Sequence, residues 1–119
     1  MDKKNLGYYG ETKAVSYLKR KGYSIVERNF SCRFGEIDII ASKADYVVFV
    51  EVKLRKNADF AMAREFVTVS KQRRIISAAS LWLAKSECEL QPRFDIIEVY
   101  APEGLFGRVQ ISHIEDAFQ

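Results

Sequence analysis

The chain has 119 residues, of which 48% are hydrophobic and 29% are charged, and its formal net charge is +3. That length fits one compact domain covering residues 1–119, and that hydrophobic share excludes a disordered chain. A charge of +3 gives a mild bias toward polyanions and excludes a histone-like protein. No stretch approaches the roughly 20 apolar residues of a membrane span, and the polar N-terminus has no signal region. We therefore expect a soluble, cytoplasmic protein with no membrane partner.

The first predicted element is a helix over residues 5–21. Ala14 and Leu18 follow Glu11 at helical spacing on one face. Gly22 ends the helix after a basic last turn, which suits the negative end of the helix dipole.

Five strands and a second helix are predicted to follow. Apolar runs bounded by turn residues predict strands over residues 23–30, 35–42, 46–55, 93–101 and 108–114. Residues 70–86 have the apolar spacing of a helix, with Ser70 as the expected cap. We expect residues 56–66 to form a loop with a helical turn, and the chain to end in a short helical tail.

The order helix-strand-strand-strand-helix-strand-strand predicts an α/β sandwich with a central mixed five-stranded sheet. Short connections favour antiparallel neighbours, and a helical crossover makes the third and fourth strands parallel if they are neighbours. The two cysteines, Cys32 and Cys88, are predicted to be reduced thiols because their separation lacks metal-type spacing.

The predicted strand over residues 46–55 carries Glu51 and Lys53 among its valines. Side chains alternate along a strand, so these two share one face, with Cα atoms roughly 6.6 Å apart. In the strand before it, Ile37 and Ile39 are expected on one face and Asp38 on the other. The short turn between the two strands can place Asp38 beside Glu51.

Two neighbouring carboxylates on a central strand need a compensating positive charge, because like charges shift a pKa and a buried unpaired charge is costly. Lys53 is one source of that charge. A divalent cation is another, since Mg²⁺ prefers one or two carboxylates together with waters and phosphates. For an isolated Glu-x-Lys sequence, a plain ion pair is the simpler interpretation. Asp38, placed one strand before Glu51, shifts the balance toward a metal site.

Asp38, Glu51 and Lys53 resemble the D…(D/E)-x-K signature of the PD-(D/E)XK nuclease superfamily, with Ile37 in the place of its proline. The segments GEIDIIA, VFVEVKLR, SKQRRIISAASLWL and RFDIIEV, with GYYGETKAVSYLKRKGYSIVERNF, resemble the YraN-like family of small bacterial proteins. This resemblance covers nearly the whole chain. It implies a restriction-endonuclease-like fold related to that of archaeal Holliday-junction resolvases.

The resemblance also implies roles for the matching residues. Asp38 and Glu51 would hold Mg²⁺ or Mn²⁺, and Lys53 would position or activate the attacking water. Glu11 would be the first-helix acid that completes the site, although a first-turn acid favoured by the helix dipole is an equal interpretation. Glu36 is expected beside Asp38, in an outer position.

Polar and basic side chains are expected to contact backbone phosphates without reading base sequence. This set comprises Arg55, Lys56, Lys71, Gln72, Arg73 and Arg74. Lys71 matches a lysine position of the family, but a surface lysine extending into solvent is its simpler interpretation. Asp95 is expected to form a structural ion pair with Arg93.

Together these features predict a divalent-metal-dependent endonuclease that hydrolyses phosphodiester bonds in nucleic acid. DNA is the expected substrate, with branched or junction DNA included. A non-catalytic nucleic-acid-binding module on the same fold is one alternative, and a structural or adaptor protein with an ion-pair network is another. A branched substrate with two scissile strands would suit a symmetric homodimer.

Overall fold

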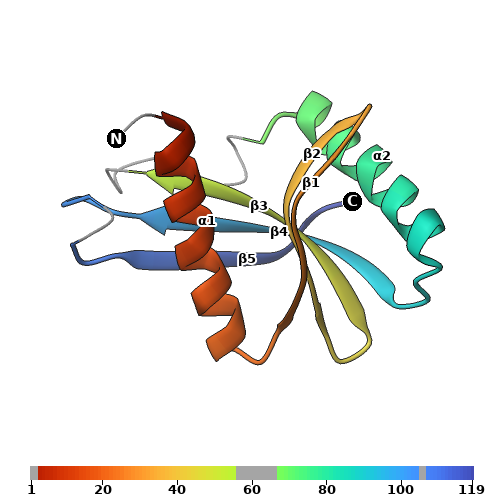
Figure 1. The fold of residues 1–119 in the computed structure, drawn as a ribbon, viewed down its shortest axis with the longest axis horizontal. Coiled ribbons are helices and arrows are strands. Elements are labelled where there is room, and N and C mark those ends of the chain that lie inside the picture. Colours follow the sequence, from red (N-terminus) through yellow and green to blue (C-terminus); the bar gives the residue numbers. More distant parts are fainter. Residues whose placement is uncertain (1–2, 56–66, 105–106) are drawn as a thin grey trace.

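A computed structural model describes residues 3–55, 67–104 and 107–119, with side chains described from Gly7 onward. The predicted helical turn within 56–66, and with it Lys56, lies outside the described residues. In chain order the elements are α1 (Lys3–Arg20), β1 (Ser24–Cys32), β2 (Gly35–Lys43), β3 (Tyr46–Arg55), α2 (Val69–Ser86), β4 (Gln91–Tyr100) and β5 (Gln110–Phe118) (Figure 1). The predicted α/β class and element order are confirmed.

The five strands form one mixed sheet in the order β1-β2-β3-β4-β5. Neighbouring strands are antiparallel except β3 and β4, which are parallel because α2 carries the chain back between them. This arrangement is consistent with a restriction-endonuclease-like fold, and it makes β3 the central strand.

The two helices cover opposite faces of the sheet (Figure 1). Ala14 and Leu18 of α1 pack in one cluster with Val48 and Val50 of β3. The other cluster contains the buried stripe of α2 together with Phe49. Alternate residues of β3 therefore reach both layers, and burial of each large apolar side chain contributes roughly 1.5–3 kcal/mol. The face that carries Phe49 also carries Glu51.

The last strand is longer than predicted. Residues up to Phe118 belong to β5, so the expected helical tail is wrong. Phe118 is buried and pairs with Phe94 of β4, and their rings stack with centroids 5.4 Å apart. Packing against β4 therefore keeps the end of the chain in the sheet.

The helix α2 begins at Val69, two residues earlier than a cap at Ser70 would allow. Thr68 is its cap, with extended backbone angles, and the Thr68 hydroxyl accepts the Lys71 N–H at 3.1 Å. Ser70 is exposed inside the helix, so its prediction as the cap is wrong. This start sets which residues of α2 face β3.

The alternation predicted for β2 fails at Asp38. Ile39 lies in the α1 cluster as one face requires, but Ile37 lies in the α2 cluster, so the two do not share a face. Opposite this point, between the pairs Arg28–Ile39 and Phe30–Ile37, Asn29 has a left-handed φ of 55°. We attribute the rotation of β2 to this local twist.

Both outer strands of the sheet are interrupted. In β1 the pairing register shifts between Ile25 and Glu27, which leaves Val26 as an extra residue. In β5 the register shifts near Asp116, whose φ is 52°. Such bulges bend a strand and increase its twist.

Cys32 and Cys88 are both free thiols, as predicted. No helix among the described residues combines the length and apolar composition needed to cross a bilayer.

Candidate metal centre

A cavity of about 540 Å³ lies where β2, β3 and the first turn of α2 meet. It is lined by Gly35, Glu36, Asp38, Glu51, Thr68, Lys71, Arg74 and Ile75. Gly35 opens β2 with φ of 138°, a conformation that L side chains rarely adopt, and thereby turns the chain into the strand that carries both Glu36 and Asp38. The cavity thus collects acids from two strands and cations from one helix.

Asp38 lies where β2 and β3 separate. Their paired register stops at Ile39 opposite Val50, and Asp38 Oδ2 accepts the Val52 N–H at 2.8 Å. Burial, followed by the charge of Glu51, raises the pKa of Asp38 to about 8. Without a cation, Asp38 therefore holds a proton at neutral pH.

Asp38 is one of three carboxylates that lie close together. One oxygen from each of Glu11, Glu36 and Asp38 lies within 4.8 Å of the other two. The Oε1 atom of Glu11 is buried and has no hydrogen-bond partner among the described residues. Arg28 Nη2 is 3.9 Å from it, and burial raises the pKa of Glu11. This buried acceptor is free to take a ligand.

Glu51 is only 4% exposed and contacts two lysines. Its Oε1 lies 2.6 Å from Lys71 Nζ and 3.7 Å from Lys53 Nζ. Burial and the neighbouring ammonium of Lys71 lower the pKa of Lys53. Burial alone would lower the pKa of Lys71, but its hydrogen bond to Glu51 and the charges of Glu51 and Asp38 together outweigh burial and raise it. The two lysines therefore differ in how readily they release a proton.

The structure brings the four predicted catalytic residues to one region but divides them into two sets. Glu11 and Asp38 share the three-carboxylate group, whereas Glu51 pairs with lysines and lies outside that group. The sequence predicted the pairing of Glu51 with Lys53. The expectation that Lys71 extends into solvent is wrong, since its ammonium binds the buried Glu51. Its family match was the only signal for this contact.

Four of the predicted phosphate contacts fall into two groups. Arg55 pairs with Glu98 at 3.2 Å, and Gln72 Nε2 donates to the Val67 carbonyl at 2.9 Å, so both have partners within the fold. Arg73 and Arg74 are exposed, and Arg74 lines the cavity. The two exposed arginines are therefore the ones best placed to meet a polyanion.

The predicted pair of Arg93 and Asp95 is confirmed, and it belongs to a larger buried network. Arg93 donates to both carboxylate oxygens of Asp95, at 2.8 and 2.9 Å. His113 Nε2 lies 2.7 Å from Asp95, and the Tyr23 hydroxyl accepts from Arg93 at 2.7 Å. Nothing in the sequence pattern linked His113 or Tyr23 to this pair.

The residues around Asp38 fit a hard divalent cation. Mg²⁺ takes carboxylate oxygens, at distances of about 2.0–2.1 Å, in preference to nitrogen or sulfur ligands. Three carboxylates within 4.8 Å repel one another unless they are protonated or bound to a cation. The unpartnered oxygen of Glu11 supplies an acceptor that a cation would satisfy.

An α/β sandwich in which acids and lysines converge at the end of a central strand defines the class as a small restriction-endonuclease-like domain. The chain belongs to Uncharacterised protein family UPF0102, whose profile matches residues 10–99, and the predicted YraN-like assignment is confirmed.

Curated relatives match the chain along nearly its whole length. A UPF0102 protein of Caldanaerobacter subterraneus subsp. tengcongensis is 44% identical over 119 residues, covering 99% of this chain and 98% of the relative. A UPF0102 protein of Geotalea daltonii is 48% identical over 118 residues, covering 98% of this chain and 91% of the relative. One of Clostridium perfringens is 44% identical over 117 residues, with coverage of 98% and 95%.

Proposed function

We propose that this protein hydrolyses phosphodiester bonds in nucleic acid, as an endonuclease that uses Mg²⁺ or Mn²⁺. The observation that carries the proposal is the grouping of Glu11, Glu36 and Asp38 within 4.8 Å, with one carboxylate oxygen of Glu11 that accepts no hydrogen bond from the described residues. A fold gains nothing in stability from three neighbouring acids, one of which has its pKa raised to about 8. Perturbed acids in a cavity are typical of functional sites.

Asp38 and Glu51 would hold the ion, with Glu11 and Glu36 as further ligands or as hydrogen-bond partners of its waters. A bound ion would neutralise charge on the scissile phosphate and acidify a water. The lowered pKa of Lys53 suits it to accept a proton from that water or to release one. Lys71, with its raised pKa, stays charged and holds Glu51 in place.

DNA is the nucleic acid we expect, including branched or junction DNA. Arg73 and Arg74 would contact backbone phosphates, which position a substrate without reading its sequence. A symmetric homodimer would suit a substrate with two scissile strands.

One observation favours the structural or adaptor alternative. The 2.6 Å contact between Glu51 and Lys71 satisfies the buried acid without any metal. That contact leaves Asp38 and Glu11 unexplained, because neither acid has a cation within 3.5 Å among the ion pairs of the described residues. An adaptor therefore needs a separate reason for those two acids.

Calorimetric titration with Mn²⁺ distinguishes these functions. The wild type should bind the ion, and Asp38→Asn should not. Asp45→Asn is the matched control, because Asp45 is exposed in the turn after β2, and it should bind like the wild type. Cleavage of linear, flapped and four-way DNA with Mg²⁺ and Mn²⁺ then identifies the substrate. A wild type that binds no Mn²⁺ and cleaves none of these substrates contradicts the proposal.

A further inference from the structure

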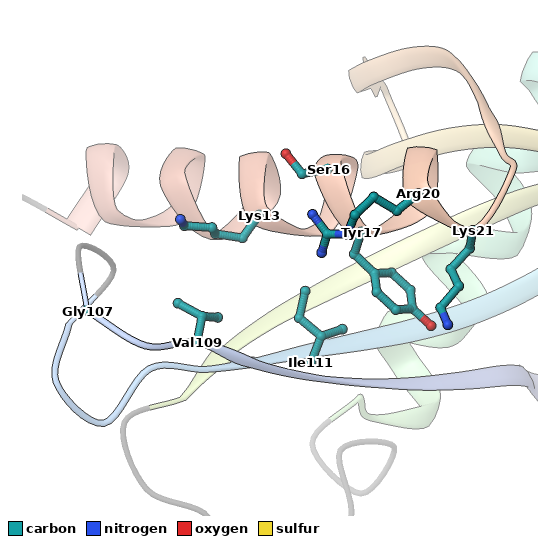
Figure 2. A pocket seen from close by; sticks show the side chains of 8 residues that line it. All are labelled: Lys13, Ser16, Tyr17, Arg20, Lys21, Gly107, Val109 and Ile111. Atoms are coloured by element: carbon teal, nitrogen blue, oxygen red, sulfur yellow. The ribbon is translucent and has the colours of Figure 1, made fainter.

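A second cavity, of about 620 Å³, lies between the C-terminal half of α1 and the beginning of β5 (Figure 2). We call it the α1–β5 groove. It is lined by Lys13, Ser16, Tyr17, Arg20, Lys21, Gly107, Val109 and Ile111. Figure 2 shows the basic side chains and Tyr17 leaving α1 above the apolar side chains of Val109 and Ile111. One wall is therefore cationic and the other is apolar.

The cations of the α1–β5 groove have no acidic partners in the part of the chain that the structure describes. Its lining includes Lys13, Arg20 and Lys21 but no carboxylate, and none of the three forms an ion pair with a described residue. The ammonium of Lys21 lies 5.8 Å from the centre of the Tyr17 ring. Positive charge is thus concentrated in a concave site, where it attracts anions more strongly than on a flat surface.

The helix dipole does not account for this pattern. Basic residues in a last turn stabilise a helix, and both Lys19 and Arg20 of α1 meet that description. Lys13 lies nearly two turns earlier, where the dipole favours no cation, and yet it lines the groove. Lys19 lies on another side of the helix and does not. Position around the helix, and not position along it, decides which cations face β5.

Tyr17 is held in a fixed orientation at the base of the groove. Its hydroxyl lies 3.1 Å from His113 Nδ1, and the two rings pack edge to face with centroids 5.5 Å apart. His113 is in turn held by the buried Asp95 at 2.7 Å. The Tyr17 ring is therefore preorganised, which reduces the entropy lost when a ligand is bound.

We propose that the α1–β5 groove binds the phosphate backbone of a single nucleic-acid strand. The choice of a nucleic acid as the polyanion rests on the proposed function. Lys13 and Arg20 are seven residues apart on the helix, or roughly 10 Å of rise, so their charges follow a line instead of surrounding one phosphate. Cations along a groove beside an aromatic ring are typical of sites for single strands.

The groove is separate from the cavity of about 540 Å³ that contains Asp38 and Glu51, which we call the acidic cavity. Glu11 leaves α1 on another flank from Lys13 and joins the acids of β2, and the two cavities share no lining residue. The nucleotides bound in the α1–β5 groove would therefore differ from those cleaved near Asp38. They would belong to a second nucleic-acid strand or to a distant part of the same one. The groove would anchor one arm of the substrate while another reaches the acids.

The test is fluorescence anisotropy with a labelled single-stranded DNA oligonucleotide in EDTA, at several salt concentrations. The variant K13Q/R20Q/K21Q should bind at least about tenfold more weakly at low salt, and the slope of log affinity against log salt should decrease by about 2. Arg20→Gln and Lys19→Gln form a matched pair of adjacent residues with equal charge change. Arg20→Gln should weaken binding, and Lys19→Gln should not.

Three results would overturn the inference: a triple variant that binds like the wild type, equal losses for Arg20→Gln and Lys19→Gln, or no binding by the wild type. Inorganic polyphosphate that competes as well as DNA, at equal phosphate concentration, would overturn the assignment to nucleic acid. Circular dichroism melts check that each variant is folded. EDTA removes cleavage, so a failure of the metal site appears as absent Mn²⁺ binding with the salt slope intact.

Discussion

Asp38 is the residue of the acidic cavity with a hydrogen bond from β3, two acidic neighbours and a raised pKa. Its side chain takes the place of a backbone acceptor for the Val52 N–H, and it lies half-buried beside two other acids. A carboxyl in that position is neutral in the absence of a cation and charged in its presence. The behaviour of this one side chain therefore separates a metal site from a structural network.

The pKa of Asp38 predicts how stability depends on pH in the metal-free protein. That pKa is about 8 in the folded chain against a reference of 3.8, so the folded state binds more protons between these values. The free energy of unfolding contributed by Asp38 therefore falls as pH rises from 4 to 8. Asp38→Asn removes this loss, and at pH 8 it should be more stable than the wild type by at least about 1 kcal/mol.

Urea unfolding in EDTA at pH 5 and pH 8 measures the effect. Asp45→Asn, in an exposed turn, should follow the wild type at both pH values. A large loss of stability in Asp38→Asn at pH 8 would contradict this prediction and favour an ion-pair network.

Cation binding should release a proton from Asp38. Below pH 8 the carboxyl must lose its proton before it can act as a ligand, so affinity for Mn²⁺ should rise with pH, by up to about tenfold per unit. Calorimetry at pH 7 in two buffers of different ionisation enthalpy gives the number of protons released, which we expect to be about one. A pH-independent affinity between 6 and 8 would mean that Asp38 is not a ligand.

The two lysines around Glu51 should respond differently to replacement. Lys53→Met leaves Glu51 with its 2.6 Å contact to Lys71, so stability should change little while cleavage falls by about 10²–10³. Lys71→Met removes the closer partner and should cost about 1–2 kcal/mol, less than a fully buried pair, because the Lys71 side chain is 43% exposed. Thermal melts and cleavage rates at fixed salt give both quantities. Unchanged cleavage by Lys53→Met would show that Lys53 is not catalytic.

Strand alternation was enough to predict that Glu51 and Lys53 share a face and that Asp38 lies near them. It was not enough to predict Lys71, because that contact depends on where α2 begins and how it docks on β3. The sequence placed Glu36 beside Asp38 and gave Glu11 as the acid that completes the site, and the structure brings one oxygen of each within 4.8 Å of the others. It does so although the left-handed φ of Asn29 marks the point where the alternation of β2 fails.

At the scale of elements, the start of α2 determines the geometry of the acidic cavity. Thr68 satisfies the Lys71 N–H, and Lys71 then extends its ammonium to Glu51. Sequence patterns located both helices and all five strands because their apolar periods are clear. They missed the cap of α2 and the end of β5, because Thr68 and Ser70 are both good caps and the burial of Phe118 against Phe94 is a tertiary contact.

Thr68→Ala should lower the free energy of unfolding by about 1 kcal/mol, because it removes the N-cap hydrogen bond of α2. Ser70→Ala is the control, since Ser70 is exposed within the first turn, and it should change stability by less than about 0.5 kcal/mol. Urea unfolding of both variants measures the difference. A larger effect from Ser70→Ala than from Thr68→Ala would contradict the assignment of the cap.

For the whole molecule, the network around Asp95 joins elements that are far apart in sequence. Asp95 of β4 accepts bonds from Arg93, from His113 of β5 and from the Asp116 N–H, while Tyr23 after α1 bonds to Arg93. Burial alone would raise the pKa of Asp95, but these hydrogen bonds outweigh it and lower the pKa. The network therefore stabilises the charged form of Asp95.

Asp95→Ala should cost about 3–5 kcal/mol of unfolding free energy, because it leaves the Arg93 guanidinium buried without its partner. Since the folded pKa of Asp95 is depressed, its contribution is present above pH 3.8 and is lost as pH falls through the folded pKa. Glu115→Ala is the control, since Glu115 is exposed and 3.5 Å from Arg93, and it should cost less than about 1 kcal/mol. Denaturant melts between pH 3 and 7 check both expectations, and equal losses for the two variants would contradict the assigned role.

The interruptions in β1 and β5 have a consequence for how copies of this protein meet in a crowded cell. An outer strand with a regular row of free N–H and C=O groups recruits strands from other chains and begins aggregation. Here the extra residue at Val26 and the left-handed turn at Asp116 break that row on both sides of the sheet. Continuous strand-by-strand growth into fibres is thereby disfavoured.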